Sequence, residues 1–260
     1  MKHREAVVAG HFYPESAQQL RDQIGGFLIP TIDSEIQAHA LIVPHAGYCY
    51  SGAVAGRAYA YLQSMMTDIK RVIILGPSHR VALDGCAISS YDAFASPLGQ
   101  IDVDNSCYDE LLKLNLVSMS DSAHLLEHSL EVQLPFLQYC LNDFKIVPIV
   151  VGYCQPGTVS SILKVLKVDD SSTLIVVSSD LSHYHPYQEA QILDNKTINK
   201  ILNYDNSVAG EDACGCFAVN GLLDYANSRK WKIKLIKKAN SGDILGAKQE
   251  VVGYASFVLY

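Results

Sequence analysis

Three short aliphatic runs constrain this chain most, because each of them is followed within a few positions by a histidine. Runs of this length and composition are typical of strands buried in a parallel sheet. The pairs are residues 41–43 with His45, residues 72–75 with His79, and residues 174–177 with His183. Parallel strands end at one edge of their sheet, where open α/β folds carry their chemistry. We therefore expect the three histidines to share one pocket. Any one of them alone could equally be a core histidine bonded to backbone.

The composition is that of a globular protein with a large core. Of the 260 residues, 49% are hydrophobic and 18% are charged. The formal charge of −7 argues against a nucleic-acid-binding surface. No apolar run is long enough for a membrane span, and no signal-peptide pattern follows the N-terminus. The seven cysteines show no disulfide framework, so we expect reduced thiols in a cytoplasmic protein.

Strand-like and helix-like segments alternate along the chain, without an internal repeat or a linker. This alternation predicts an α/β fold, a three-layer α/β/α sandwich with a largely parallel or mixed central sheet. We expect one domain over residues 1–260. The predicted helices include residues 51–65, 127–140 and 215–227, and the predicted strands include residues 88–95, 145–151 and 251–259.

Six motifs in a fixed order give the chain a family resemblance. They are HFYP at 11–14, PHAGYCYSG at 44–52, GPSH at 76–79, EHSLEVQLPFL at 127–137, SSDLSHY at 178–184 and CG at 214–215. Together they resemble the Memo family, from about residue 4 to the C-terminus. Members occur beside AMMECR1-like and radical-SAM proteins in microbial genomes, which makes those proteins possible partners.

The resemblance implies a fold similar to that of class III extradiol dioxygenases, which hold non-haem iron with two histidines and a carboxylate. It also implies that His45, His79 and Cys214 are the metal ligands, because these positions match the family's ligand motifs. Two imidazoles and one thiolate leave coordination positions open, as a catalytic metal site requires. The set suits one ion of iron, copper or zinc, and thiolate shifts the preference toward softer ions. The resemblance supplies no substrate.

Four further residues are candidates for chemistry around that ion. We expect His183 to act as an acid or base, with Asp180 fixing its tautomer, because the two lie three residues apart after a strand. We also expect Glu127 and His128 to begin a helix whose first turn points at the metal pocket. The alternatives are helix capping by the two carboxylates and histidines that are simply at the surface or bonded in the core.

Residues 124–128 also match the H-x-x-E-H pattern of inverted zinc peptidases. On one helix, His124 and His128 would fall on the same face and Glu127 would be the base. A pattern with three fixed positions is common by chance, and the peptidase interpretation leaves the other three histidines without a role. His124 is therefore the residue that separates the two interpretations.

Cys214 and Cys216 compete for the role of sulfur ligand. Cys214 precedes Gly215 at the expected amino terminus of a helix, where N–H groups favour a thiolate and glycine lets the backbone approach an ion. Cys216 should be a small buried hydrophobe. The function we expect is a metal-dependent redox enzyme with a dioxygenase-like pocket for an unknown small molecule or peptide. The alternatives are a non-catalytic adaptor or metal carrier, and a zinc hydrolase.

Overall fold

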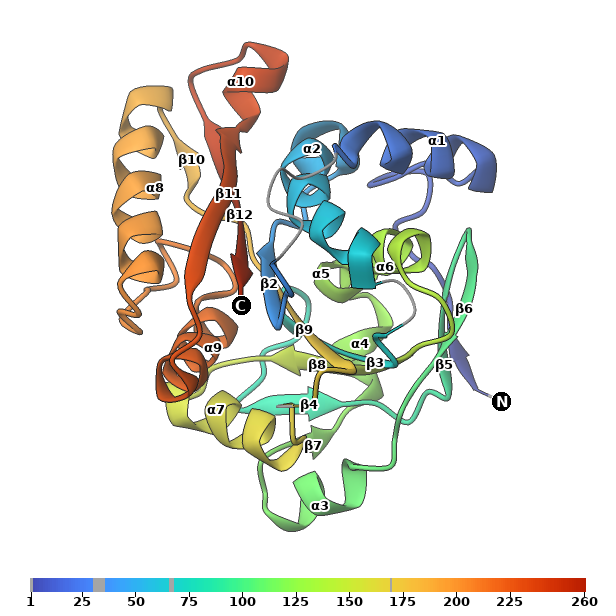
Figure 1. The fold of residues 1–260 in the computed structure, drawn as a ribbon. Coiled ribbons are helices and arrows are strands. Elements are labelled where there is room, and N and C mark those ends of the chain that lie inside the picture. The colour runs from blue at the N-terminus through green and yellow to red at the C-terminus, as the bar shows by residue number, and fades with distance from the viewer. Residues whose placement is uncertain (1, 30–35, 66–67, 169) are drawn as a thin grey trace.

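The computed structural model describes residues 2–29, 36–65, 68–168 and 170–260. A large mixed sheet lies between layers of helices (Figure 1), which confirms the predicted three-layer α/β/α sandwich. In spatial order its strands are β10 (His183–His185), β12 (Val251–Leu259), β2 (Ala40–Val43), β9 (Thr173–Ser178), β3 (Arg71–Pro77), β8 (Lys145–Val151), β4 (Cys86–Ile88) and β7 (Ser118–Met119). Strand β11 (Ile233–Asn240) pairs with β12 outside this path.

The centre of the sheet is parallel and is flanked by antiparallel strands on both sides, since β4 also runs antiparallel to β8. Strands β2, β9, β3 and β8 run in the same direction, whereas β12 is antiparallel to β2 and to β11. The three strands that precede the predicted histidines, β2, β9 and β3, are therefore direct neighbours. Their carboxyl ends meet at one edge, and this arrangement fixes where the functional side chains gather.

Helices pack on both faces of the sheet. On one face lie α1 (Ala17–Phe27), α2 (Tyr48–Tyr59) with the 3₁₀ helix η1 (Ala60–Met65), α5 (His128–Glu131) and α6 (Leu134–Cys140). On the other lie α7 (Pro156–Val165) and α9 (Cys216–Arg229), while α8 (Tyr187–Leu202) and α10 (Ser241–Leu245) pack against β11 and β12. The remaining elements are α3 (Tyr108–Lys113), α4 (Asp121–Leu125), and a small sheet of β1 (His3–Arg4), β5 (Ala93–Ser96) and β6 (Gly99–Asp102).

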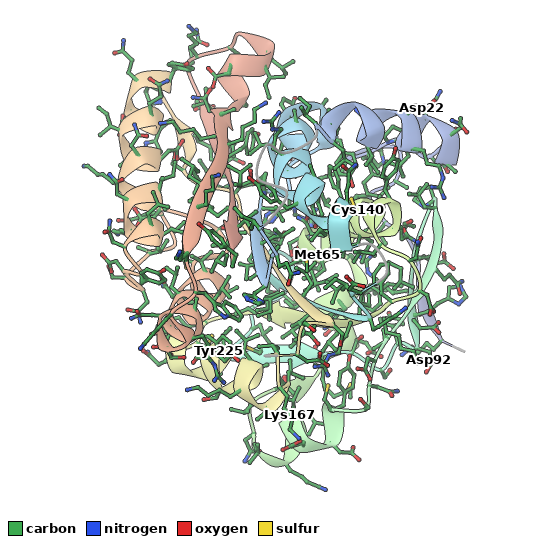
Figure 2. All side chains as sticks on the ribbon, viewed as in Figure 1. Asp22, Met65, Asp92, Cys140, Lys167 and Tyr225 are labelled. Atoms are coloured by element: carbon green, nitrogen blue, oxygen red, sulfur yellow. The ribbon has the colours of Figure 1, made fainter. Side chains whose placement is uncertain are left out.

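Apolar side chains from these elements form the hydrophobic core. Every residue of β2 and β9 is buried, and each large aliphatic side chain so placed contributes about 1.5–3 kcal/mol. Figure 2 shows side chains filling the layers, with Cys140 and Tyr225 buried and Asp22 and Lys167 exposed. The core takes residues from both ends of the chain, and the single domain over residues 1–260 stays a prediction. In the described parts of the chain, every helix is too short or too polar to span a bilayer.

Three predicted elements have different bounds in the structure. The predicted helix at 127–140 is two short helices, α5 and α6, with Pro135 in the first turn of the second. Proline in an unbroken helix would clash with the carbonyl of Glu131, so a new helix must begin near it. The predicted strand at 88–95 is divided between β4 and β5, and the helix predicted from residue 51 begins earlier, at Tyr48.

Candidate metal centre

A cavity of about 800 Å³ opens at the carboxyl ends of β2, β3 and β9. Six of the seven residues singled out from the sequence line it: His45, His79, His128, Asp180, His183 and Cys214. Glu127 is the exception, because its buried side chain lies behind His79 and is not part of the lining. The histidines that follow the three parallel strands are thus brought together, as the repeated pattern predicts.

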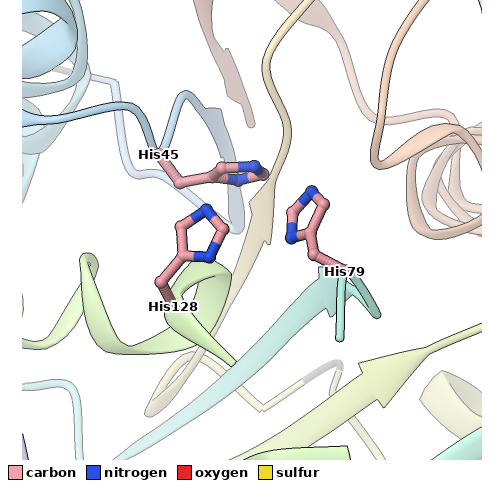
Figure 3. Close-up of side chains that lie close together, drawn as sticks. All are labelled: His45, His79 and His128. Atoms are coloured by element: carbon pink, nitrogen blue, oxygen red, sulfur yellow. The ribbon is translucent and has the colours of Figure 1, made fainter. Parts of the chain in front are cut away.

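Three of these histidines form a tight group. Figure 3 shows the rings of His45, His79 and His128 converging from three different segments of the chain. The ring centroids of His79 and His128 are 4.7 Å apart in a stacked pair, and His45 meets His79 edge-on at 5.2 Å. One nitrogen from each ring lies within 4.8 Å of the others. The group is compact enough to share one ion.

The tautomer of His45 is fixed by a buried hydroxyl. Its Nδ1 lies 2.8 Å from Oγ of Ser178, and that hydroxyl donates to the carbonyl of Ser129 at 2.7 Å. A hydroxyl has a single hydrogen, so Ser178 must accept from Nδ1 of His45. The proton of the imidazole is therefore on Nδ1, and Nε2 carries the free lone pair. Metal-binding histidines are held in this way by hydrogen-bond partners behind the ring.

A buried glutamine supports the same hydroxyl. Nε2 of Gln133 donates to Ser178 at 2.8 Å and to the carbonyl of Pro44 at 3.0 Å. The hydroxyl of Tyr59 donates to Oε1 of the same glutamine at 3.0 Å. A carbonyl can only accept, so the contact with Pro44 fixes which end of the amide is nitrogen. Every donor between Tyr59 and His45 is therefore assigned, and Ser178 accepts from both Gln133 and His45.

Glu127 fixes the tautomer of His79. Its Oε1 accepts from Nδ1 of His79 at 2.9 Å, and its Oε2 accepts the backbone N–H of the same residue at 2.6 Å. Ser129 donates its backbone N–H to Oε1 as well. Burial opposes ionisation, but the hydrogen bonds from His79 and Ser129 prevail and lower the pKa of Glu127 to about 2. Nε2 of His79 is therefore the nitrogen left free, as in carboxylate–histidine–metal arrangements.

His128 is the first residue of α5 and stays neutral at physiological pH. Burial, with repulsion from Arg80, lowers its pKa to about 4, against the attraction of Glu127. Its buried Nδ1 lies 3.5 Å from Oε1 of Glu127 and forms no hydrogen bond with any described residue. Phe12 packs on the ring at a centroid distance of 4.8 Å. This histidine is held by packing instead of by a directional bond.

Cys214 lies beside His45, at the residue before the cap of α9. Its Sγ is 3.3 Å from Nε2 of His45 and accepts the backbone N–H of Asp180 at 3.3 Å. The expectation of a thiolate favoured by the helix terminus is wrong for the metal-free site. Burial, together with the carboxylate of Asp180, raises the pKa of the Cys214 thiol well above its usual range. An ion would have to displace that proton.

Gly215 serves a different purpose from the one we predicted. A Cβ at this position would lie 2.6 Å from the carbonyl oxygen of Ser178 and 2.7 Å from Cβ of Ser179. Its N–H donates to Oγ of Ser179 at 3.0 Å. Glycine is required because the start of α9 packs directly against the loop after β9. This contact determines the position of Cys214. Cys216 is buried, as predicted, with 3% of its surface exposed.

Asp180 does not orient His183, contrary to our prediction. Its Oδ1 accepts the backbone N–H of His45 at 2.8 Å, so it shapes the loop after β2. Burial raises the pKa of Asp180 to about 6, although backbone N–H groups of His45 and Ala46 act in the opposite direction. The His183 ring lines the cavity, and burial lowers its pKa. Spacing along the sequence could not predict this direction, because the partner of Asp180 belongs to the loop after another strand.

The H-x-x-E-H pattern does not form a metal site. Helix α4 ends at Leu125 and α5 begins at His128, so His124 and His128 are not on one helix. Nε2 of His124 donates to the carbonyl of Ala87 at 3.0 Å, and its ring packs against Phe94. Its backbone carbonyl accepts from Arg4. His124 is a buried structural residue outside the histidine group, and the hydrolase alternative loses its support.

The donor set fits a transition-metal ion. Two imidazoles offer Nε2 lone pairs fixed by their partners, a thiol sulfur lies 3.3 Å from one of them, and a third imidazole completes the group. Nitrogen and sulfur donors of this kind suit iron, copper or zinc better than calcium or magnesium. The described residues therefore provide a site that could hold one such ion with positions left open to the cavity.

Sequence reasoning missed several residues that shape this cavity. Ser178 and Gln133 support His45, and both fall inside motifs that we quoted without assigning them roles. Arg80 and Tyr254 line the cavity, one directly after His79 and the other on β12. Arg80 could have been found from its position beside a candidate ligand. Tyr254 could not, because its place depends on how β12 pairs with β2.

Comparison with known proteins assigns the chain to a family. The Memo-like protein family model matches residues 4–258. A MEMO1 family protein of Sulfurisphaera tokodaii is 37% identical over 278 residues, covering 97% of this chain and 98% of that protein. One from Archaeoglobus fulgidus is 33% identical over 266 residues, covering 98% of each. A crystal structure of an uncharacterised Escherichia coli K12 protein matches 84% of this chain and 98% of that one, with a TM-score of 0.53 and 13% identity, and this shows a shared fold. The chain therefore belongs to the Memo-like protein family.

Proposed function

We propose that this protein is a metal-dependent redox enzyme whose single ion is held by His45, His79 and Cys214. The observation that carries the proposal is the state of the two imidazoles. Ser178 and Glu127 each require the proton on Nδ1, which leaves Nε2 of both rings available at the cavity. Two neighbouring imidazoles that are both held with Nε2 free at one cavity are arranged as the ligands of a single ion are.

The cavity supports an enzyme over an adaptor or a metal carrier. Its volume of about 800 Å³ falls within the range of small-molecule sites, roughly 300–1,000 Å³. A carrier needs ligands but no space beside them for an organic molecule. We propose iron or copper as the ion, with zinc as the alternative, because the donors suit all three. When bound, the ion would supply Lewis-acid and redox chemistry at its open positions.

The chain's own residues would prepare the reaction. Glu127 and Ser178 hold the two rings in position and keep their protons away from the ligand nitrogens. His183 lines the cavity and is placed to take or give a proton to a bound molecule. His128 stacks on His79 and presents a neutral ring to the same space. Asp180 fixes the loop that carries His45, so its role is positioning.

Metal content of purified variants tests the ligand set. His45→Ala and His79→Ala should each lower metal affinity by more than about 100-fold, since loss of a supporting partner alone costs about 10–100-fold. His124→Ala is the matched control and should keep its metal, because that ring bonds to Ala87. Metal loss in the His124 variant with retention in the other two would reverse the assignment.

The third ligand is decided by a second set of variants. Cys214→Ser should lose most of the metal, whereas Cys216→Ser should retain it. His128→Ala covers the rival arrangement, in which the three histidines bind the ion and the thiol does not. Retention in Cys214→Ser with loss in His128→Ala would establish the three-histidine set. Oxygen consumption by iron- or copper-loaded protein, compared under aerobic and anaerobic conditions, then tests redox activity.

A further inference from the structure

One part of the cavity lining is not used by the proposed metal site. Arg80 follows His79 at the rim, and it is the one arginine or lysine among the described lining residues. It forms no ion pair and no hydrogen bond with any residue that the structure describes. An arginine fork with no protein partner, beside an active-site cavity, is suited to binding a carboxylate or phosphate of a ligand.

Tyr254 supplies a second polar group that has no partner. It is buried, with 2% of its surface exposed, yet its hydroxyl bonds to no described residue and keeps some accessible surface. Its side chain lines the metal cavity and also a second cavity next to Asp194 and Lys238. The groups that act on this phenol are Asp180, Tyr50 and Cys49, and the first two line the metal cavity. Burial, with those neighbours, raises the pKa of the hydroxyl, so it remains a hydrogen-bond donor. Because the hydroxyl keeps accessible surface and has no protein partner, it is free to donate to a ligand oxygen in place of water.

The rest of the lining defines the body of the ligand. Phe12, Tyr50 and Tyr184 place aromatic surface around the cavity. A single arginine balances one negative charge, and the lining also contains the carboxyl groups of Asp180 and Glu211. After metal removal, a dianion would therefore be disfavoured relative to a monoanion, because like charges repel across such a space, whereas a bound ion would add positive charge of its own.

We infer that the cavity takes up a small, partly apolar organic acid, with its carboxylate bound by Arg80 and a second oxygen accepting from Tyr254. This inference rests on the proposed function in treating the cavity as the substrate site. It names the class of substrate, which the metal ligands leave open. Arg80 acts here as a specificity residue at the rim, and neither residue is a metal ligand.

A set of related probes tests the charge requirement. The probes are 4-hydroxybenzoate, its uncharged analogue 4-hydroxybenzamide, and phenyl phosphate, titrated calorimetrically into the full-length protein as purified and after metal removal. We expect 4-hydroxybenzoate to bind about tenfold more tightly than the amide, because a hydrogen-bonded charge contact is worth roughly that factor or more. Tighter binding of phenyl phosphate to the metal-free protein would overturn the monoanion assignment. Equal binding of benzoate and amide, or binding of neither, would overturn the inference.

Substitutions of Arg80 and Tyr254 test whether these two residues bind the probe. Arg80→Ala should weaken 4-hydroxybenzoate about tenfold and leave the amide unchanged, with Arg80→Lys intermediate because lysine lacks the planar fork. Arg21→Ala, on α1 and outside the lining, is the matched control. Tyr254→Phe keeps the buried ring and should weaken 4-hydroxybenzoate by about two- to tenfold, while unsubstituted benzoate is affected less. Unchanged affinity in Arg80→Ala would contradict the inference.

Metal analysis of the same samples separates the two proposals. If no sample binds metal but the preference for the carboxylate depends on Arg80, the substrate class stands and the proposed function fails. If metal binds as proposed and the Arg80 variant behaves as the parent protein does, the proposed function stands and the substrate class is wrong. Titration of the metal-free protein ensures that coordination of the probe to an ion is not the signal measured.

Discussion

Glu127 and Glu131 lie four residues apart, and both carboxylates are buried, but they serve different regions of the molecule. Glu131 pairs with Arg4 and also accepts the backbone N–H groups of Val7 and Val8 and the hydroxyl of Tyr13. Each of those donors belongs to the N-terminal segment. The Glu131 cluster, meaning these five residues, fastens that segment to α5 and is not part of the lining of the metal cavity.

The carboxylate of Glu127 receives its hydrogen bonds from a different region of the chain. Its donors include the ring of His79, whose other nitrogen is directed to a space without a protein partner. The comparison shows that burial and complete hydrogen bonding of a carboxylate do not identify a functional site. What distinguishes the site is that the partner of the carboxylate keeps one group free for a ligand. Arg4 connects the two regions, since it also donates to the backbone carbonyls of His124 and Glu127.

The largest expected effect is on stability. Glu131→Ala leaves the buried guanidinium of Arg4 without its partner, which should lower the free energy of unfolding by about 3–5 kcal/mol. Urea denaturation followed by circular dichroism measures it. The metal content of the folded fraction should stay at the parental level. Loss of metal at urea concentrations where the fold persists would show that metal binding depends on the Glu131 cluster. The two regions would then not be functionally separate.

The second prediction concerns acid stability through His124. Burial lowers its folded-state pKa to about 4, from about 6.5 in the unfolded chain. Its contribution is therefore complete above pH 6.5 and is lost as the pH falls from 6.5 toward 4, by about 3 kcal/mol at most. His124→Gln has no group that titrates in this range and should show a shallower fall in unfolding free energy between pH 7 and pH 4. Identical pH profiles would show that His124 contributes nothing to acid unfolding.

The third prediction is that Glu127→Gln weakens metal binding without a matching loss of stability. The amide can still accept one hydrogen bond but no longer favours a proton on Nδ1 of His79, so affinity should fall by about 10–100-fold. Competition with a chelator of known affinity measures it. Gln133→Glu is unsuitable as a control because it adds a buried charge, so Glu131→Gln serves instead. An equal loss of affinity in Glu131→Gln would mean that the distinction between the two carboxylates is wrong.

The smallest expected effect lies at the far end of the hydrogen-bond chain behind His45. Tyr59→Phe removes the bond to Gln133 and should cost about 1 kcal/mol of stability, with less than about a threefold change in metal affinity. The amide is still fixed by Pro44 and Ser178, so the ring of His45 should not turn. Thermal unfolding measures the change in stability, and competition with a chelator measures the change in metal affinity. A tenfold fall in metal affinity would place Tyr59 in the functional region.

Local patterns predicted the elements that carry the site. The short aliphatic runs predicted β2, β3 and β9, and the position of each histidine after a run predicted that their side chains would meet. These inferences succeeded because a parallel sheet turns a sequence pattern directly into a shared edge. The break at Pro135 follows from the proline itself and was overlooked, whereas the direction of Asp180 was missed because its partner, the backbone N–H of His45, comes from elsewhere in the chain.

The sequence by itself determined the fold class, the family, and the residue types gathered at the carboxyl edge of the sheet. Hydrophobic periodicity and motif order depend on near neighbours, so they can be read without coordinates. The tertiary structure decided which nitrogen of each histidine is free, why Gly215 must be glycine, and which glutamate serves the site. Those properties depend on hydrogen bonds and contacts between residues that are tens of positions or more apart. Such contacts exist only once the layers have packed, and for that reason the same residue type has opposite roles at 127 and at 131.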